Sequence, residues 1–192
     1  MDTFAWRRPD LLEKIRVFEV DHPATQAFKL GRIGELGWAK PANLHFVPVD
    51  FTTMNLASAL RAAAFDPGEL SFFSWLGVTM YLTRDEVFAT LRSLAGTAPS
   101  GSIVVFDYLE TQSFSEAERN SIKSEYRKGL QQLGEPMKTG FDPRTLAEQL
   151  AGIGWKLREN LTPADIQDRF FSGRTDGCHA SDDACLALAV VE

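Results

Sequence analysis

Two acidic residues stand at the ends of short apolar segments and are the first candidates for chemistry. Asp21 ends the segment VFEVD (17–21), and Asp50 ends the segment LHFVPVD (44–50). A carboxylate in such a place can accept the two hydroxyls of a ribose, or the amino group of a base, through charge-assisted hydrogen bonds. Each contact of this kind contributes about 1.5 to 3 kcal/mol. Spacing alone leaves an alternative open, because either residue could instead cap the helix that follows it.

Histidine and cysteine are too sparse to favour another kind of site. His22, His45 and His179 could act as general bases, but an isolated histidine is more often structural. Cys178 and Cys185 lack the paired spacing of a zinc site or of a disulfide framework. With His179 they offer three metal ligands in one loop, whereas a closed zinc site needs four. We therefore predict no metal and two reduced thiols.

Apolar segments alternate with helix-like segments along the chain, and this alternation decides where strands end. The expected strands cover residues 17–21, 44–50, 70–78, 102–108, 155–161 and 185–191, and the expected helices cover 24–36, 54–65, 83–94, 115–134, 143–153 and a short stretch after 162. N-cap patterns precede helices at Thr83, Ser115, Asp142 and Thr162. Such alternation predicts an open, mostly parallel α/β sheet with helices on both faces. The last two strands break the rhythm, which allows an antiparallel pair at the end of the sheet.

Composition narrows the class of partner. The net charge of −6 and the pI near 5.2 argue against nucleic acid, because phosphate binding needs a concentrated basic surface. No apolar run is long enough to span a membrane, and the amino-terminal residues are too charged for a signal peptide. We expect a cytoplasmic protein with a small-molecule partner. A chain of 192 residues is about the size of one domain, so we expect a single domain over residues 1–192.

Six blocks of sequence, taken together, carry a resemblance. They are DTFAWRRP (2–9), VFEVDHPATQAFK (17–29), FVPVDF (46–51), FFSWLGVTMYLT (72–83), SIVVFDY (102–108) and FDPRTLAEQLAGIGW (141–155). With these blocks the chain resembles the class I S-adenosylmethionine-dependent methyltransferases of the leucine carboxyl methyltransferase-like family, over nearly its whole length. The resemblance implies a Rossmann-like methyltransferase sheet whose last strand is antiparallel and in which the strand ending at Asp50 lies at an edge. Pro48 suits an edge strand, since proline cannot donate to a β-ladder.

The resemblance also implies how S-adenosylmethionine would be held as a cofactor. Asp21 would accept the ribose hydroxyls, and Asp50 would accept the adenine amino group. The backbone N–H of Phe51 would serve a ring nitrogen of the base, and its side chain would pack against the base. For Asp50 and Phe51 the alternative is an N-cap and a core aromatic residue.

Further positions follow from the resemblance alone. Asp2 and Thr3 would lie near the methionine moiety, and the segment 74–81 would line the methyl-transfer pocket. Many relatives carry Glu at the position of Leu76, so this pocket would lack one acceptor here. Core packing is an equal or better explanation of the remaining large side chains of the segment, which are Trp75, Met80 and Tyr81.

In the family, the dipeptide Asp-Thr directly follows a glycine-rich turn at the end of the first, central strand. Here that dipeptide occupies positions 2 and 3, so we expect the first central strand and its glycine loop to be missing from this chain. Gly31, Gly34 and Gly37 cannot replace the loop, because they follow a helix and not a strand. The alternative function is therefore a truncated, non-catalytic remnant or interaction module. Such a chain could form a homo-oligomer through exposed sheet edges.

The implied activity is methyl transfer, with O-methylation of a small molecule or carboxylate as the expected reaction. A carboxylate acceptor is already ionised at neutral pH, so we assign no catalytic base. A nicotinamide-dependent oxidoreductase would also use an acidic residue after its second strand. It would, however, keep the alternation of strands and helices to the end of the sheet.

Overall fold

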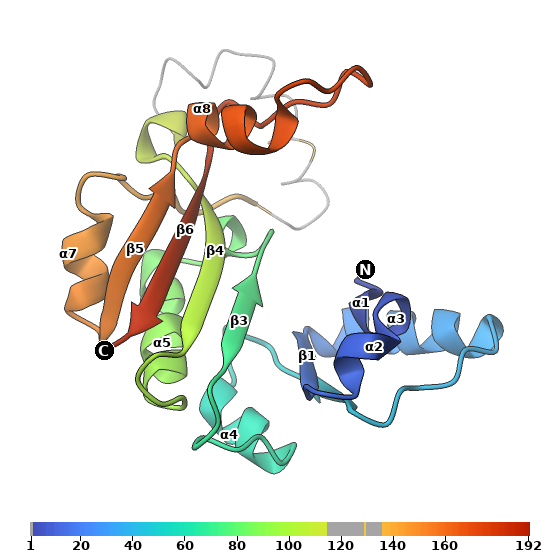
Figure 1. Ribbon diagram of the computed structural model, residues 1–192. Coiled ribbons are helices and arrows are strands. Elements are labelled where there is room, and N and C mark those ends of the chain that lie inside the picture. The colour runs from blue at the N-terminus through green and yellow to red at the C-terminus, as the bar shows by residue number, and fades with distance from the viewer. Residues whose placement is uncertain (1, 115–128, 130–135) are drawn as a thin grey trace. The chain divides into compact units, whose positions relative to one another are not determined.

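The computed structural model describes residues 2–114, 129 and 136–192 (Figure 1). The chain forms two compact units, Met1–Asp66 and Pro67–Glu192. A single domain over residues 1–192 stays a prediction. The capped helix expected over 115–134 lies outside the described residues, Gly129 excepted. None of the described helices is long and apolar enough to cross a lipid bilayer.

The first unit is built around two parallel strands. β1 (Val17–Asp21) pairs with β2 (Leu44–Pro48), and α3 (Pro23–Glu35) connects them. A helix is needed in this place because two parallel strands cannot be joined by a tight turn. The remaining helices of the unit are α1 (Phe4–Arg7), α2 (Pro9–Leu12) and α4 (Leu56–Ala62). The strand–helix–strand order predicted for this region is confirmed.

The apolar residues of β2 supply much of the core of this unit. Leu44 and Val47 are buried, and Leu44 packs with Ala5 and Leu12 of the two amino-terminal helices. Pro48 is exposed at the end of the strand. Within the described part of the chain β2 pairs with β1 alone, so the proline lies on an edge strand and interrupts no ladder.

The two longer helices of the first unit begin at caps other than the acidic candidates. His22 caps α3, where its Nδ1 accepts the backbone N–H of Ala24 at 3.3 Å. Asn55 caps α4, where its Oδ1 accepts the backbone N–H of Ser58 at 3.0 Å. α4 begins at Leu56, later than expected, because the Asn55 amide satisfies a free N–H donor of the first turn.

The second unit contains a mixed sheet in the order β3-β4-β6-β5 (Figure 1). Its strands are β3 (Phe72–Trp75), β4 (Ile103–Leu109), β5 (Trp155–Leu161) and β6 (Ala184–Val191). β3 and β4 are parallel, whereas β6 runs antiparallel to both β4 and β5. The predicted antiparallel last strand is confirmed.

Helix α5 (Arg84–Ala95) packs against one face of this sheet. It begins at the predicted capping box, in which the side chains of Thr83 and Glu86 each accept a backbone N–H of the other residue. The Trp155 side chain of β5 is fully buried, and its Nε1–H donates to the Leu91 carbonyl of α5 at 2.8 Å. This buried hydrogen bond ties the helix to the edge strand.

Short helices complete the second unit. They are η1 (Thr79–Tyr81), η2 (Thr111–Phe114), α7 (Leu146–Ala151), α8 (Pro163–Ile166) and the π-helical η4 (Gln167–Phe171). The N-cap expected at Asp142 is wrong, because Thr145 holds the N-cap position of α7. Asp142 instead accepts the backbone N–H and the guanidinium of Arg144 in the preceding turn. The strand expected over 70–78 is shorter than predicted, and Gly77 turns the chain beyond its end with a φ of 73°.

Candidate functional site

Asp21 lies at the carboxyl end of β1, which is where open parallel sheets bind their ligands. The residue is half-buried, and its Oδ1 accepts the backbone N–H of His22 at 2.7 Å. Among the described residues, no hydrogen bond engages the second carboxylate oxygen. Helix capping does not account for Asp21, since His22 holds the N-cap position of α3.

Asp50 lies just beyond the end of β2 and is also half-buried. Its Oδ1 accepts the hydroxyl of Thr52 at 2.6 Å and the backbone N–H of Thr52 at 2.9 Å. These two hydrogen bonds hold the pKa of Asp50 below its usual value, against a smaller opposing effect of desolvation. The carboxylate is therefore ionised at neutral pH and acts as an acceptor.

The structure brings these two carboxylates to the same end of one pair of strands. Asp21 lies opposite Pro48 in the parallel register, and the backbone N–H of Val49 donates to the Asp21 carbonyl at 2.9 Å. Asp50 directly follows Val49 in the sequence, so it lies next to the residue that bonds to Asp21. Residues far apart in the sequence thus meet at one edge. Their assignment to a ribose and an adenine stays a prediction.

The other candidates of the first unit lie in two local turns. Phe51 is half-buried in the turn that follows β2. Asp2 Oδ1 accepts the backbone N–H of Phe4 at 3.0 Å, and Thr3 Oγ1 accepts the Nε–H of Arg7 at 3.1 Å. Asp2 and Thr3 therefore hold the first turn of α1. Their place beside a methionine moiety stays a prediction.

The segment 74–81 forms the end of β3 and the turn into η1. Trp75 and Met80 are buried, as the packing alternative predicts, whereas Leu76 is 53% exposed. Thr79 is fully buried, and its hydroxyl donates to the Asp107 carbonyl at 2.6 Å. The end of β3 is therefore fastened to the neighbouring strand β4.

Asp107 is an acidic residue near a strand end that the sequence reasoning missed. It is half-buried on β4, and its Oδ1 accepts the backbone N–H of Gly77 at 2.8 Å. Burial raises the pKa of Asp107, and the Gly77 N–H offsets this effect only in part. The signal was available, because Asp107 stands near the end of the apolar run 102–108, much as Asp21 and Asp50 end theirs.

Because of Asp107, we expect the free energy of unfolding to fall as the pH rises above 3.8, the ordinary pKa of an aspartate. Between that value and its raised folded pKa, the folded state binds more protons than the unfolded state. No charged side chain of the described part of the chain contributes to this shift. The free energy of unfolding of Asp107→Asn, relative to wild type, should therefore increase as the pH rises above about 4. Urea unfolding at several pH values measures this difference.

Asp142 provides a control of opposite sign. The Arg144 guanidinium, through a side-chain hydrogen bond, lowers the pKa of Asp142 to about 2. The contribution of the ionised Asp142 to the free energy of unfolding is therefore fully present above the ordinary aspartate pKa of 3.8. It is lost as the pH falls through about 2. Asp142→Asn should become less stable than wild type as the pH rises through that lower window. A pH-independent difference for Asp107→Asn would contradict the prediction.

The three histidines have structural contacts. His22 caps α3, and the His45 ring stacks on the Phe18 ring with centroids 4.8 Å apart. His179 Nδ1 lies 2.8 Å from the Ala180 carbonyl oxygen. No general base is assigned among them.

The two cysteines are free thiols in different surroundings. Cys178 is exposed and Cys185 is buried. Burial is the main cause that raises the pKa of Cys185 to about 12, which keeps this thiol protonated. In the described part of the chain, no group of three His, Cys, Asp or Glu side chains could hold a metal ion.

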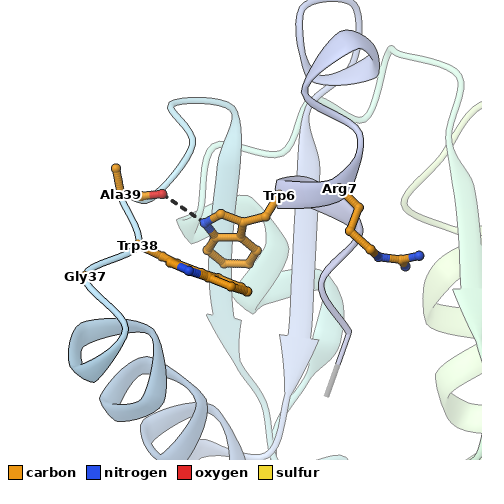
Figure 2. Close-up of a pocket in the computed structure, with 5 residues that line it drawn as sticks. All are labelled: Trp6, Arg7, Gly37, Trp38 and Ala39. Carbon is orange, nitrogen blue, oxygen red and sulfur yellow. Dashed lines mark hydrogen bonds between the residues drawn. The ribbon is translucent and has the colours of Figure 1, made fainter.

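A pocket of about 540 Å³ in the first unit does not contain the acidic candidates. Its lining comes from Trp6, Arg7, Gly37, Trp38 and Ala39 (Figure 2). The Trp6 and Trp38 ring centroids are 5.9 Å apart, and the Trp6 Nε1–H donates to the Ala39 carbonyl at 2.9 Å, while Arg7 points away from both rings (Figure 2). Part of the lining follows the end of α3, a helix that starts at the carboxyl end of β1 and returns toward the start of β2. The candidate ligand site is therefore placed at the strand ends, not here.

A family pattern and a similar protein sequence both match this chain. The pattern of the family described as leucine carboxyl methyltransferase matches residues 1–95. A protein of Bacillus subtilis (strain 168), named as the S-adenosyl-L-methionine-dependent methyltransferase YktD, is 38% identical over 180 residues. The alignment covers 94% of this chain and 59% of YktD, so the chain spans about three-fifths of that relative.

Solved structures share the fold of this chain. A DUF574 family protein from Streptomyces avermitilis has a TM-score of 0.62 at 17% identity, over 92% of this chain and 65% of that chain. The O-methyltransferase NcsB1 from neocarzinostatin biosynthesis, solved with S-adenosylmethionine and 2-hydroxy-5-methyl naphthoic acid, has a TM-score of 0.55 at 14% identity. That likeness covers 98% of this chain and 46% of NcsB1. At these identities the comparison shows the fold alone, which is the α/β methyltransferase fold.

Proposed function

We propose that this chain, which belongs to the leucine carboxyl methyltransferase family, binds S-adenosylmethionine at the carboxyl ends of β1 and β2 and serves methyl transfer to a small molecule. One observation carries the proposal. Asp21 and Asp50 stand at the same end of two hydrogen-bonded parallel strands, and other residues cap the helices that follow. The names of the relatives support the choice of cofactor.

Each residue of the site has a role that suits its surroundings. Asp21 accepts the ribose hydroxyls. It uses its second carboxylate oxygen, Oδ2, which accepts no hydrogen bond from the described residues. Asp50 accepts the adenine amino group and stays ionised because Thr52 lowers its pKa. Phe51 follows Asp50 directly, and we assign its backbone N–H to a ring nitrogen of the base and its side chain to the face of the base.

The cofactor supplies, when bound, a methyl group on a positively charged sulfur. We propose an oxygen acceptor, a small carboxylate or hydroxyl compound. This choice is supported by NcsB1, a protein of the same fold that is named an O-methyltransferase and was solved with a naphthoic acid. The net charge of −6 argues against a nucleic acid as the methyl acceptor.

Titration calorimetry with S-adenosylmethionine tests the proposal on the chain as it stands. We expect saturable binding with a Kd below about 1 mM, the upper end of common values for enzyme substrates. NAD is the control ligand, because an acidic residue after a strand also serves its ribose. Binding of NAD without binding of S-adenosylmethionine would point to an oxidoreductase. A folded chain that binds neither would refute the proposal.

The sheet edges favour a second function, that of an interaction module without catalysis. Within the described residues of the first unit, taken by itself, β1 pairs with one strand, β2. An unpaired strand edge presents free N–H and C=O groups to another chain. In this alternative the chain keeps the fold and forms a homo-oligomer through these edges. Light scattering on the sample used for calorimetry separates the two, because an oligomer that binds no cofactor supports the module.

A further inference from the structure

A buried lysine in the middle of α3 joins three segments of the first unit. Lys29 is 3% exposed. Its Nζ forms an ion pair with the Glu19 carboxylate on β1 and donates to the Asp2 carbonyl at 2.5 Å. The same Nζ lies 5.7 Å from the ring centroid of Trp6, on α1. Lysine is almost never buried without such partners, so these contacts define where its ammonium lies.

Packing alone does not explain this ion pair. Moving an ammonium and a carboxylate out of water is costly, and apolar replacements of a buried ion pair are often neutral or stabilising. The side chains of Lys29 and Glu19 are 4% and 17% exposed, so both charges are largely removed from solvent. Directional hydrogen bonds, unlike apolar contacts, fix the relative positions of the segments that they join.

The joined segments lie next to the candidate ligand site. Glu19 is two residues before Asp21 on β1, so the two side chains share a face of the strand about 7 Å apart. Gln26, also buried on α3, donates its amide to the Glu19 carbonyl at 3.3 Å. On the other side, Lys29 holds the Asp2 carbonyl. The ammonium therefore links the start of the chain to the strand that carries Asp21.

We propose that Lys29 is a positioning residue that holds the segment of Asp2 and Thr3 beside the ligand site at the end of β1. The inference rests on the proposed function, since it gives this segment the amino-acid end of the cofactor. Backbone groups and the Thr3 hydroxyl offer the acceptors and donors that an ammonium and a carboxylate need. Lys29 touches no ligand and acts through the Asp2 backbone. Its loss should weaken recognition of the amino-acid end and leave recognition of the nucleoside intact.

Two ligands separate these ends of the cofactor. S-adenosylhomocysteine and 5′-methylthioadenosine share the nucleoside and a neutral thioether sulfur, and the second lacks the amino-acid group. Titration calorimetry with both ligands compares wild type with Lys29→Met. We expect S-adenosylhomocysteine to bind about tenfold more weakly, the loss of about one charge-assisted hydrogen bond, and 5′-methylthioadenosine to change by less than about twofold.

Two further variants make the result decisive. Lys14→Met, at an exposed lysine of the same unit, should leave both affinities unchanged. Glu19→Gln/Lys29→Met removes both charges, so it should fold even if Lys29→Met does not. Its affinity for S-adenosylhomocysteine, relative to that for 5′-methylthioadenosine, should be lowered as in Lys29→Met. Equal losses for both ligands, or an unchanged ratio in the double variant, would overturn the inference. Wild-type protein that binds neither ligand would overturn the proposed function and this inference together.

Discussion

Replacing Asp21 by Ala is expected to weaken the binding of S-adenosylmethionine by about 10- to 150-fold. That range corresponds to the loss of about 1.5 to 3 kcal/mol from hydrogen bonds to a charged acceptor. The side chain is half-buried at the end of β1, and Oδ1 accepts the His22 N–H. Asp21→Asn should have a smaller effect, since an amide keeps one acceptor oxygen but loses the charge. Titration calorimetry of the three proteins measures the difference.

Asp10→Asn is the matched control for charge. Asp10 is an exposed acidic residue of the same unit, paired with Arg8 at 2.7 Å. Its removal changes the net charge by the same amount but takes nothing from the end of β1. We expect its affinity for S-adenosylmethionine to stay within about twofold of wild type. An equal loss in Asp10→Asn and Asp21→Asn would show that net charge, and not the position of Asp21, governs binding.

Replacing Trp155 by Ala is expected to lower the free energy of unfolding of the second unit by about 3 to 5 kcal/mol. The side chain is fully buried between β5 and α5, and its Nε1–H donates to the Leu91 carbonyl at 2.8 Å. Truncation would leave a large cavity and remove a buried hydrogen bond, and each adds to the cost. Urea unfolding followed by circular dichroism measures the change.

Phe170→Ala tests whether the effect belongs to burial. Phe170 is a large aromatic residue of the same unit but is 51% exposed. Its truncation should change the free energy of unfolding by no more than about 0.5 kcal/mol, as is usual for surface positions. A loss for Trp155→Ala as small as that for Phe170→Ala would mean that β5 and α5 are not held together by this contact.

Helix starts were the most predictable local feature, because a cap is written in a few adjacent residues. The capping boxes at Thr83 and Thr162 are both present in the structure. Asp142 shows the limit of this reasoning. The Asp142 carboxylate accepts the backbone N–H and the guanidinium of Arg144, and the helix begins only after Thr145. Competition between nearby partners is not visible in a capping pattern.

The candidate site was predictable in its strand ends and not in its surroundings. An apolar run that closes with an acidic residue located Asp21 and Asp50, because a charged side chain is rarely buried inside a strand. Asp107 is less easily located, because its apolar run closes with Tyr108 and not with the acidic residue. Lys29 gave no local signal, since the partners that bury it lie at Glu19 and Asp2, distant in the sequence.

The sequence by itself determined the alternation of strands and helices and the two acidic strand ends, because each depends on residues close together in the chain, and the resemblance to the family implied the antiparallel last strand. The tertiary structure alone decided the register that sets Asp21 opposite Pro48, and the contacts by which Lys29 joins Asp2 to β1. Register and burial decide these contacts, and both arise only when distant segments pack against each other.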